Sequence, residues 1–137
     1  MGTLDRLLKL MLNYTSLLDG LSISDLNDVY KYYSAVYLLQ SQAQALIDIV
    51  IKAAAALGLE VEGYVDAGSK LAMLGILSED EFSRYRSIVR FRNLVIHQYG
   101  IIDVDVIRRI IGNGEYRDTA RLGLKIVNEL KRRGIDC

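Results

Sequence analysis

The stretch "SEDEFSRYRSIVRFRNLVIHQYG", residues 78–100, carries the start and stop signals of one long helix. Ser78 and Glu81 have the spacing of a capping box, in which each side chain accepts a hydrogen bond from the backbone N–H of the other residue. Apolar residues then recur at helical spacing as far as Tyr99, and Gly100 is placed to end the helix. The stretch therefore predicts a helix of about six turns between these two signals.

Helical signals continue on both sides of this stretch. The chain contains no proline, the strongest helix breaker, and no alternating run that would favour a β-strand. Its 137 residues suffice for one core, so we expect a single domain over residues 1–137. The prediction is an all-α fold, a four-helix bundle with additional short helices. The other expected helices cover residues 4–18, a long segment that Ser22 or Ser24 caps and that runs to about Leu57, residues 64–74, part of 103–114, and residues 116–133.

The net charge of zero hides a split along the chain. Residues 1–83 carry 5 basic and 11 acidic side chains (−6), whereas residues 84–133 carry 12 basic and 5 acidic ones (+7). Ten of those twelve basic residues are arginines, whose planar guanidinium binds phosphate through two hydrogen bonds. The excess indicates either a solvated helix surface or a face for a polyanion such as RNA or a nucleotide. Charge alone favours the solvated surface.

Cysteine and hydropathy patterns point to the cytoplasm. The single cysteine, Cys137, has no partner for an internal disulfide, and its own role stays open. No residues have the spacing of metal ligands, and we expect no cofactor. Charged residues interrupt the apolar N-terminus and the most apolar run, so neither is expected to act as an export signal or to cross a membrane.

Arg92 lies in the middle of an apolar side of the predicted helix, which also carries Tyr85 and Val95. A charge in such a place is costly unless a partner compensates it. Three explanations compete. The side chain can extend to the surface, it can pair with an acid of another helix such as Asp48, or it can face an anion-binding cleft at a subunit interface.

Polar residues form a separate stripe on the same helix: Arg86, Arg90, Asn93 and His97. His97, the only histidine, lies about 140° around an ideal helix from Arg92, whereas Tyr99 shares the face of Arg92. One straight helix therefore separates Arg92 from His97. Two copies packed about a two-fold axis would bring two such pairs into one cleft. In such a dimer, part of the contact is expected from Tyr85, Ile88, Val95 and Tyr99.

The segment "RNLVIHQY", residues 92–99, resembles the R-x4-H-x-Y signature of the HEPN superfamily, specifically its HepT-like branch of toxins. The matching positions are Arg92, the polar Asn93, His97 and Tyr99. The preceding "LAMLGILSEDEF" and the following "IIDVDVIRRII" are also similar to that branch. Chain length and helix order agree, so the resemblance covers essentially the whole chain.

This resemblance implies a metal-independent RNA endonuclease of a bacterial or archaeal toxin–antitoxin pair, with two motifs at a homodimer interface. It also implies a minimal nucleotidyltransferase as the cognate antitoxin, and control through adenylylation of Tyr99. In such an enzyme Arg92 and His97 are the expected catalytic residues. Asn93, Arg86 and Arg90 are expected to orient the imidazole or bind the RNA backbone.

The residue types suit this chemistry. RNA can be cleaved by its own 2′-hydroxyl, so the protein supplies only a base, an acid and charge stabilisation, and histidine and arginine provide these. Two alternatives stay open at this stage. The chain can be a non-catalytic helical adaptor that positions a nucleotidyltransferase, with Arg92 and His97 contacting a nucleotide. It can also be a purely structural bundle in which Arg92 is ion-paired.

Overall fold

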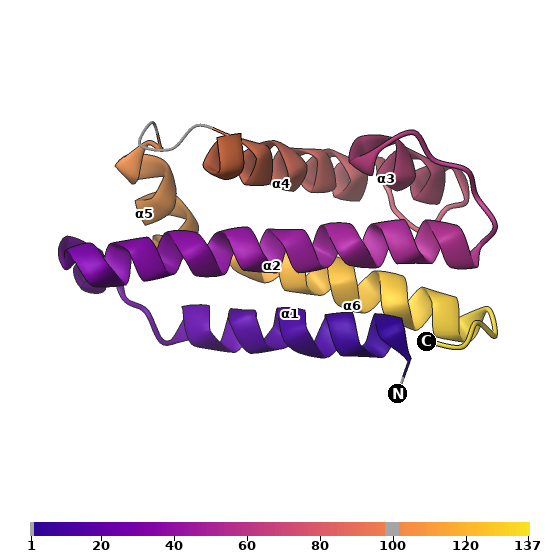
Figure 1. Ribbon diagram of the computed structural model, residues 1–137, viewed down its shortest axis with the longest axis horizontal. Coiled ribbons are helices and arrows are strands. Elements are labelled where there is room, and N and C mark those ends of the chain that lie inside the picture. The colour runs from indigo at the N-terminus through magenta and orange to yellow at the C-terminus, as the bar shows by residue number, and fades with distance from the viewer. Residues whose placement is uncertain (1, 98–101) are drawn as a thin grey trace.

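A computed structural model of the chain describes residues 2–97 and 102–137, and these form helices and loops without a strand. The all-α prediction is thereby confirmed. Figure 1 shows the helices lying along one long axis, with α5 shorter and turned at one end. The elements are α1 (Thr3–Asp19), the 3-10 helix η1 (Ile23–Asn27), α2 (Val29–Ala56), α3 (Tyr64–Met73), α4 (Glu79–His97), α5 (Val104–Gly112) and α6 (Tyr116–Arg132).

Local signals set the ends of several helices. At the start of α4, the Ser78 backbone N–H donates to Glu81 (2.8 Å) and the Glu81 N–H donates to Ser78 Oγ (3.1 Å), so the predicted capping box is confirmed. Gly134 follows α6 with a φ of +80°, a left-handed conformation that glycine adopts without strain. The predicted stop at Gly100 lies outside the described residues.

The start of α2 differs from the prediction. Ser22 does not cap the long helix; it precedes η1, and its backbone N–H donates to Asp25 (2.9 Å). The cap of α2 is Asp28, whose carboxylate accepts from the N–H groups of Tyr30 (2.9 Å) and Lys31 (3.0 Å). The prediction of a Ser22 or Ser24 cap was wrong because a carboxylate four to six residues later satisfies the free N–H groups of the first helical turn.

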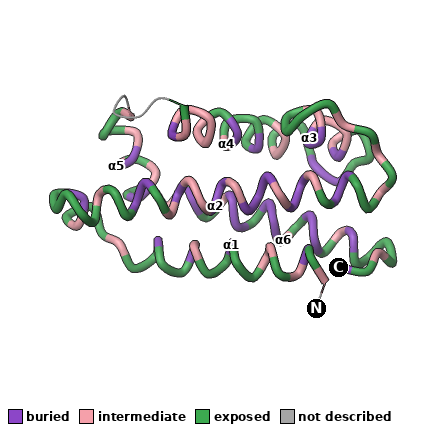
Figure 2. Tube along the Cα trace, viewed as in Figure 1, coloured by how far each residue is buried: buried purple, intermediate pink, exposed green. Residues whose placement is uncertain are grey.

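The core has two parts, and α2 passes through both. One cluster joins α1, α2, α3, α4 and α6, and a second lies where α5 meets α1, η1, α2 and α4. Figure 2 shows α2 mostly buried in its central and C-terminal turns. By length and hydropathy α2 is long and apolar enough to cross a membrane, but 56% of its most apolar window is buried inside this protein. Packing in the core accounts for that composition.

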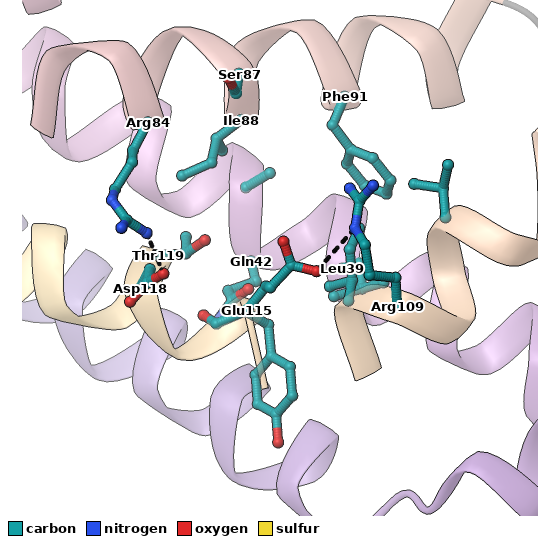
Figure 3. A pocket seen from close by; sticks show the side chains of 14 residues that line it. Leu39, Gln42, Arg84, Ser87, Ile88, Phe91, Arg109, Glu115, Asp118 and Thr119 are labelled. Atoms are coloured by element: carbon teal, nitrogen blue, oxygen red, sulfur yellow. Dashed lines mark hydrogen bonds and ion pairs between the residues drawn. The ribbon is translucent and has the colours of Figure 1, made fainter. Parts of the chain in front are cut away.

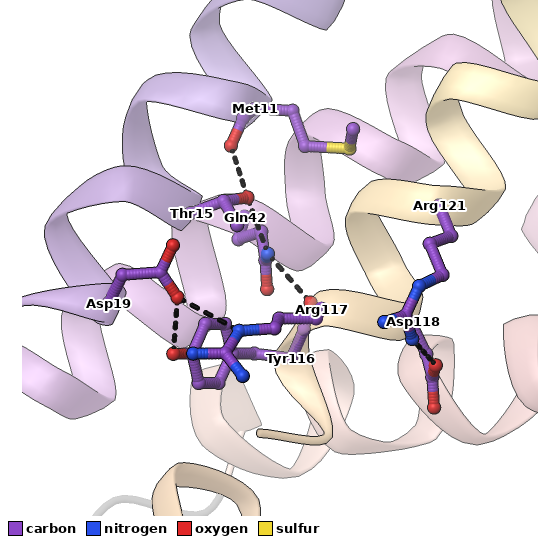
Figure 4. Close-up of polar contacts among 8 residues, drawn as sticks. All are labelled: Met11, Thr15, Asp19, Gln42, Tyr116, Arg117, Asp118 and Arg121. Atoms are coloured by element: carbon purple, nitrogen blue, oxygen red, sulfur yellow. Dashed lines mark hydrogen bonds and ion pairs between the residues drawn. The ribbon is translucent and has the colours of Figure 1, made fainter.

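A buried polar chain links three helices at the centre of the bundle (Figure 4). The side-chain amide of Gln42 on α2 donates to Thr15 Oγ1 and to the backbone carbonyl of Tyr116, both at 2.9 Å. Thr15 in turn donates to the carbonyl of Met11 (2.8 Å). The Tyr116 hydroxyl donates to Asp19 (2.6 Å). Because buried polar groups are costly when unpaired, this chain fixes the alignment of α1, α2 and α6.

The relative direction of α2 and α4 positions the candidate site. The two helices run antiparallel along the bundle, so the C-terminal turns of α4 lie beside the N-terminal half of α2 (Figure 1). At the other end of α4, the Tyr85 ring packs directly against Gly68 of α3, where an added Cβ would lie 2.5 Å from the ring. The Tyr85 hydroxyl donates to the backbone carbonyl of Tyr64 (2.8 Å). These contacts hold α4 at a fixed depth against α2 and α3.

Candidate functional site

Arg92 lies between α2 and α3, and both helices contact its guanidinium. Its Nε donates to Oε1 of Gln44 on α2 (2.7 Å), and its Nη1 donates to Oδ1 of the neighbouring Asn93 (2.9 Å). The guanidinium also lies over the Tyr64 ring of α3, with 5.5 Å from Cζ to the ring centroid. The side chain is half-buried. Its head group is therefore held in one orientation before any ligand arrives.

These contacts use only part of the hydrogen-bonding capacity of Arg92. A guanidinium has five N–H donors, and two of them are engaged. Among residues 2–97 and 102–137, Arg92 makes no ion pair. Asp48 reaches it only indirectly, because Gln44 Nε2 donates to Asp48 (2.9 Å) and Oε1 of the same amide accepts from Arg92. Of the three explanations for the position of Arg92, a direct ion pair with Asp48 is therefore excluded. The guanidinium is held in one orientation and keeps free N–H donors, which suits a site that binds an anion.

The predicted polar stripe is present on α4, but its members have different roles. Asn93 orients Arg92 rather than His97. Arg86 and Arg90 are exposed, and Arg86 stacks over the Phe82 ring (5.5 Å). His97 is exposed at the C-terminal end of α4, and none of the described residues forms a hydrogen bond with it. Tyr99 lies outside the described residues.

The pairing of arginines distinguishes α4 from the rest of the basic half of the chain. Six of its ten arginines form ion pairs: Arg84, Arg109, Arg117, Arg121, Arg132 and Arg133. The four without an ion pair to any described residue are Arg86, Arg90, Arg92 and Arg108. Three of these four belong to α4. The solvated-surface interpretation therefore holds for much of the basic half, whereas α4 keeps uncompensated positive charge around the motif.

The structure corrects one expectation about a two-fold contact. Tyr85 and Val95 are only 1% and 4% exposed, because the other helices of the same chain cover them. They are therefore not available to a second copy, and their proposed part in a dimer contact was wrong. Burial in an apolar environment also raises the pKa of the Tyr85 phenol, which stays neutral. Ile88 remains half-buried.

A cavity of about 330 Å³ lies on another flank of α4, among α2, α4, α5 and α6 (Figure 3). Ile88 and Phe91 form part of its apolar wall. The ion pairs of Arg84 with Asp118 and of Arg109 with Glu115 stand beside it. Arg92, Asn93 and His97 do not line this cavity, so the motif residues form a separate surface site.

Sequence reasoning missed Gln44 and Tyr64 as parts of the Arg92 site. Both belong to helices distant in sequence, and neither has a local signal that points to Arg92. In the described part of the chain, no group of three or more His, Cys, Asp or Glu side chains is placed to hold a metal ion. The site therefore offers arginine donors, an amide and one exposed imidazole.

Comparisons with known proteins agree with this fold. A cytosolic protein of unknown function from Bacillus subtilis, YutE, superposes with a TM-score of 0.82 at 14% identity, covering 95% of this chain and 90% of that one. A toxin–antitoxin crystal structure with AMP-PNP superposes with a TM-score of 0.67 at 19% identity, covering 92% of each chain. A search of curated protein sequences found no match. The profile of the ribonuclease HepT-like family matches residues 7–122, most of the chain, and the protein therefore belongs to this family.

Proposed function

We propose that this protein is a metal-independent RNA endonuclease, the toxin of a bacterial or archaeal toxin–antitoxin pair. The observation that carries the proposal is Arg92, which is half-buried and held by Gln44 and Asn93, with three N–H donors left for an anion. Family membership supplies the reaction class, and the uncompensated arginines of α4 supply attraction for a polyanion.

The proposed reaction uses the RNA 2′-hydroxyl as its nucleophile. A base removes the 2′-hydroxyl proton, the 2′-oxygen forms a bond to phosphorus, and the bond from phosphorus to the 5′-oxygen breaks as an acid protonates the leaving oxygen. The products are a 2′,3′-cyclic phosphate and a 5′-hydroxyl. Arg92 stabilises the negative charge of the pentacoordinate phosphorus, and His97 carries a proton as base or acid.

A homodimer supplies the second proton carrier. The reaction transfers two protons, and each chain contains one histidine. His97 lies about 140° around α4 from Arg92, so a cleft shared by two subunits would combine Arg92 of one subunit with the histidine of the other. The exposed position of His97 at the end of α4 leaves its imidazole accessible to a second copy or to RNA.

The proposed partner is a minimal nucleotidyltransferase antitoxin that adenylylates Tyr99. One of the similar folds comes from a toxin–antitoxin structure with a bound ATP analogue, which is consistent with this assignment. Adenylate on Tyr99 would place a negative charge two residues from His97 and compete with RNA phosphate for Arg92. A cytoplasmic location follows from an RNA substrate, and the similar YutE is described as cytosolic.

Cleavage of RNA by the purified protein tests the proposal. Wild type should cleave in excess EDTA and leave cyclic phosphate ends. His97→Ala and Arg92→Ala should each lower the rate by roughly 10²-fold or more, because each removes a proton carrier or the charge stabiliser. Arg121→Ala is the matched control, since Arg121 is exposed but paired with Asp118 on α6. Full activity of His97→Ala would exclude the mechanism.

A second candidate is a non-catalytic adaptor of a nucleotidyltransferase. The oriented Arg92 guanidinium suits a nucleotide phosphate as well as an RNA phosphate. The adaptor would bind ATP or its partner through Arg92 and His97 and would leave RNA intact at any protein concentration. The same cleavage assay therefore separates the two candidates.

A further inference from the structure

Three tyrosines of α2 are exposed although each carries a large aromatic ring. Tyr30, Tyr33 and Tyr37 are 81%, 66% and 60% exposed. With Ser34 and Leu38 they line an open hollow on the surface of α2. Such a run of exposed aromatic rings on one helix indicates a binding surface rather than a core.

The tyrosines lie on the same face of α2 as the residue that holds Arg92. On a helical wheel at 100° per residue, Tyr30, Tyr33, Tyr37 and Gln44 fall within a 60° sector. Gln44 accepts the hydrogen bond from Arg92, two turns after Tyr37. The run of tyrosines therefore leads along α2 toward the candidate site.

The antiparallel packing of α2 and α4 brings His97 to the level of this run. His97 lies five residues after Arg92, about 7.5 Å further along α4. Because the helices are antiparallel and Arg92 is level with Gln44, the same distance on α2 leads back five residues from Gln44. His97 therefore lies near the level of Tyr37 to Gln40. The half-buried Tyr32 packs against the same core cluster as Val95, two residues before His97. These relations place Tyr37 at about the same level along the bundle as the exposed end of α4.

The spacing of the tyrosines suits the planes of nucleic-acid bases. Tyr33 and Tyr37 are one turn apart, about 6 Å along the axis. This is close to two stacking steps of roughly 3.4 Å, so one base plane fits between two such rings. Tyr33 is also held by an edge-to-face contact with Tyr32, with ring centroids 5.6 Å apart. A ring fixed in this way loses little freedom when it stacks on a base.

We propose that Tyr30, Tyr33 and Tyr37 form a track on which the unpaired bases of single-stranded RNA stack as the strand enters the Arg92 site. This inference rests on the proposed ribonuclease function and adds its substrate class. Charge complementarity favours RNA as the occupant, because the neighbouring α4 carries Arg86 and Arg90 without an ion pair to any described residue. Aromatic rings beside free cations are the usual means by which proteins bind single strands.

The track has a direction. Tyr37 is nearest the site, whereas Tyr30 lies beside the carboxylate of Asp28, which caps the helix and repels phosphate. The contribution to RNA binding therefore falls from Tyr37 through Tyr33 to Tyr30. A duplex, whose bases are already stacked and paired, cannot use the track.

Binding measurements with uncleaved RNA test the track. Every protein carries His97→Ala, and the probe is a short fluorescein-labelled single-stranded RNA followed by anisotropy. Tyr37→Ala should raise the Kd about 5- to 150-fold, the change that corresponds to one lost base–aromatic stack. Tyr37→Phe, which keeps the ring, should bind nearly as the parent does. Met73→Ala, at an exposed position on α3, should leave the Kd unchanged.

An RNA with abasic sites provides the sharper comparison. If bases stack on the track, the parent should lose at least as much affinity for this RNA as Tyr37→Ala loses for the normal RNA. The parent and Tyr37→Ala should then bind the abasic RNA equally well. Equal binding of normal and abasic RNA by the parent would overturn the track. So would a Tyr33→Ala/Tyr37→Ala protein that binds RNA normally but loses self-association or antitoxin binding, since the face would then contact protein.

Cleavage of RNA by wild type, measured beside these binding assays, separates this inference from the proposed function. If wild type cleaves RNA and the tyrosine variants bind RNA as tightly as their parent, only the track is wrong. If wild type neither binds nor cleaves RNA, the ribonuclease assignment fails and the track fails with it.

Discussion

The Oε1 atom of Gln44 lies 2.7 Å from Nε of Arg92, and this contact joins the centre of α2 to the motif helix. The other end of the same amide donates to Asp48 (2.9 Å), so the amide cannot rotate without losing one bond or the other. An uncharged acceptor orients Arg92 and leaves its positive charge available, whereas a carboxylate in this place would neutralise it.

Substitution of Gln44 should affect catalysis more than folding. Gln44→Leu removes the acceptor, and kcat should fall about 10- to 150-fold, as for a hydrogen bond of roughly 1.5–3 kcal/mol to a charged group. Gln44→Glu keeps an acceptor but adds a charge, so KM for RNA should rise more than kcat falls. Steady-state kinetics separate the two effects, with Gln40→Leu one turn away as the control. Wild-type kinetics in both Gln44 variants would contradict the positioning role.

Mixed dimers should show whether two subunits share one cleft. Wild-type and His97→Ala chains with different tags are co-expressed, and the heterodimer is isolated through both tags. If the two proton transfers use both histidines, the heterodimer should be nearly as inactive as the double variant. About half of the wild-type rate would mean that each subunit works alone. An active protein that sediments strictly as a monomer would exclude the shared cleft altogether.

Incubation with the cognate nucleotidyltransferase and ATP should add one adenylate to Tyr99. The modified protein should lose RNA cleavage, because the new phosphodiester competes for Arg92. Intact-mass measurement detects the adduct, and Tyr99→Phe is the matched variant. An unchanged mass in wild type, or an adduct that persists in Tyr99→Phe, argues against this form of control.

The buried amide of Gln42 should matter for stability and not for RNA. Gln42→Leu removes two buried hydrogen bonds, to Thr15 Oγ1 and to the carbonyl of Tyr116, and each contributes roughly 0.5–1.5 kcal/mol. Urea unfolding should show a lower midpoint with an unchanged m-value. Asn13→Ala, at an exposed position on α1, serves as the control. A midpoint that matches wild type would mean that these two hydrogen bonds make no net contribution to stability.

The last turn of α6 should contribute to the acid dependence of stability. Hydrogen bonds from Arg132 and Arg133 lower the pKa of Glu129 to about 2. A carboxylate with a lowered folded pKa stabilises the protein above its unfolded value, and this contribution disappears as the pH falls through the folded value. Glu129→Gln should therefore lower the Tm at neutral pH, and its melting curve should approach that of wild type near pH 2. Glu62→Gln, at an exposed carboxylate, should give parallel curves instead.

The sequence predicted those features that depend on neighbouring residues. The capping box of Ser78 and Glu81, the helix of the motif and the unusual position of Arg92 all follow from spacing within one segment. The start of α2 was misplaced because Ser22 and Asp28 both have capping side chains, and only the folded chain shows which one meets the free N–H groups of the helix.

The partners of α4 could not be predicted in the same way. A helical wheel identifies an apolar side but not the surface that covers it, so Tyr85 and Val95 were assigned to a dimer contact although this chain buries them. Gln44 and Tyr64 contact Arg92 across 48 and 28 positions of sequence, and no periodicity links them. These contacts come from the packing of α2, α3 and α4.

Three arginines of α4 form no ion pair with any described residue, and they set how strongly RNA binding should depend on salt. A cation that already has a carboxylate partner releases few ions from RNA, whereas a free one displaces about 0.7 of a condensed counterion from a single strand. Arg86, Arg90 and Arg92 would then give a slope of roughly −2 for each protomer when the logarithm of the binding constant is plotted against that of the salt concentration. Counterion release from RNA would thus be concentrated on one helix. A salt dependence calculated from all twelve basic residues of this half of the chain would be far too steep.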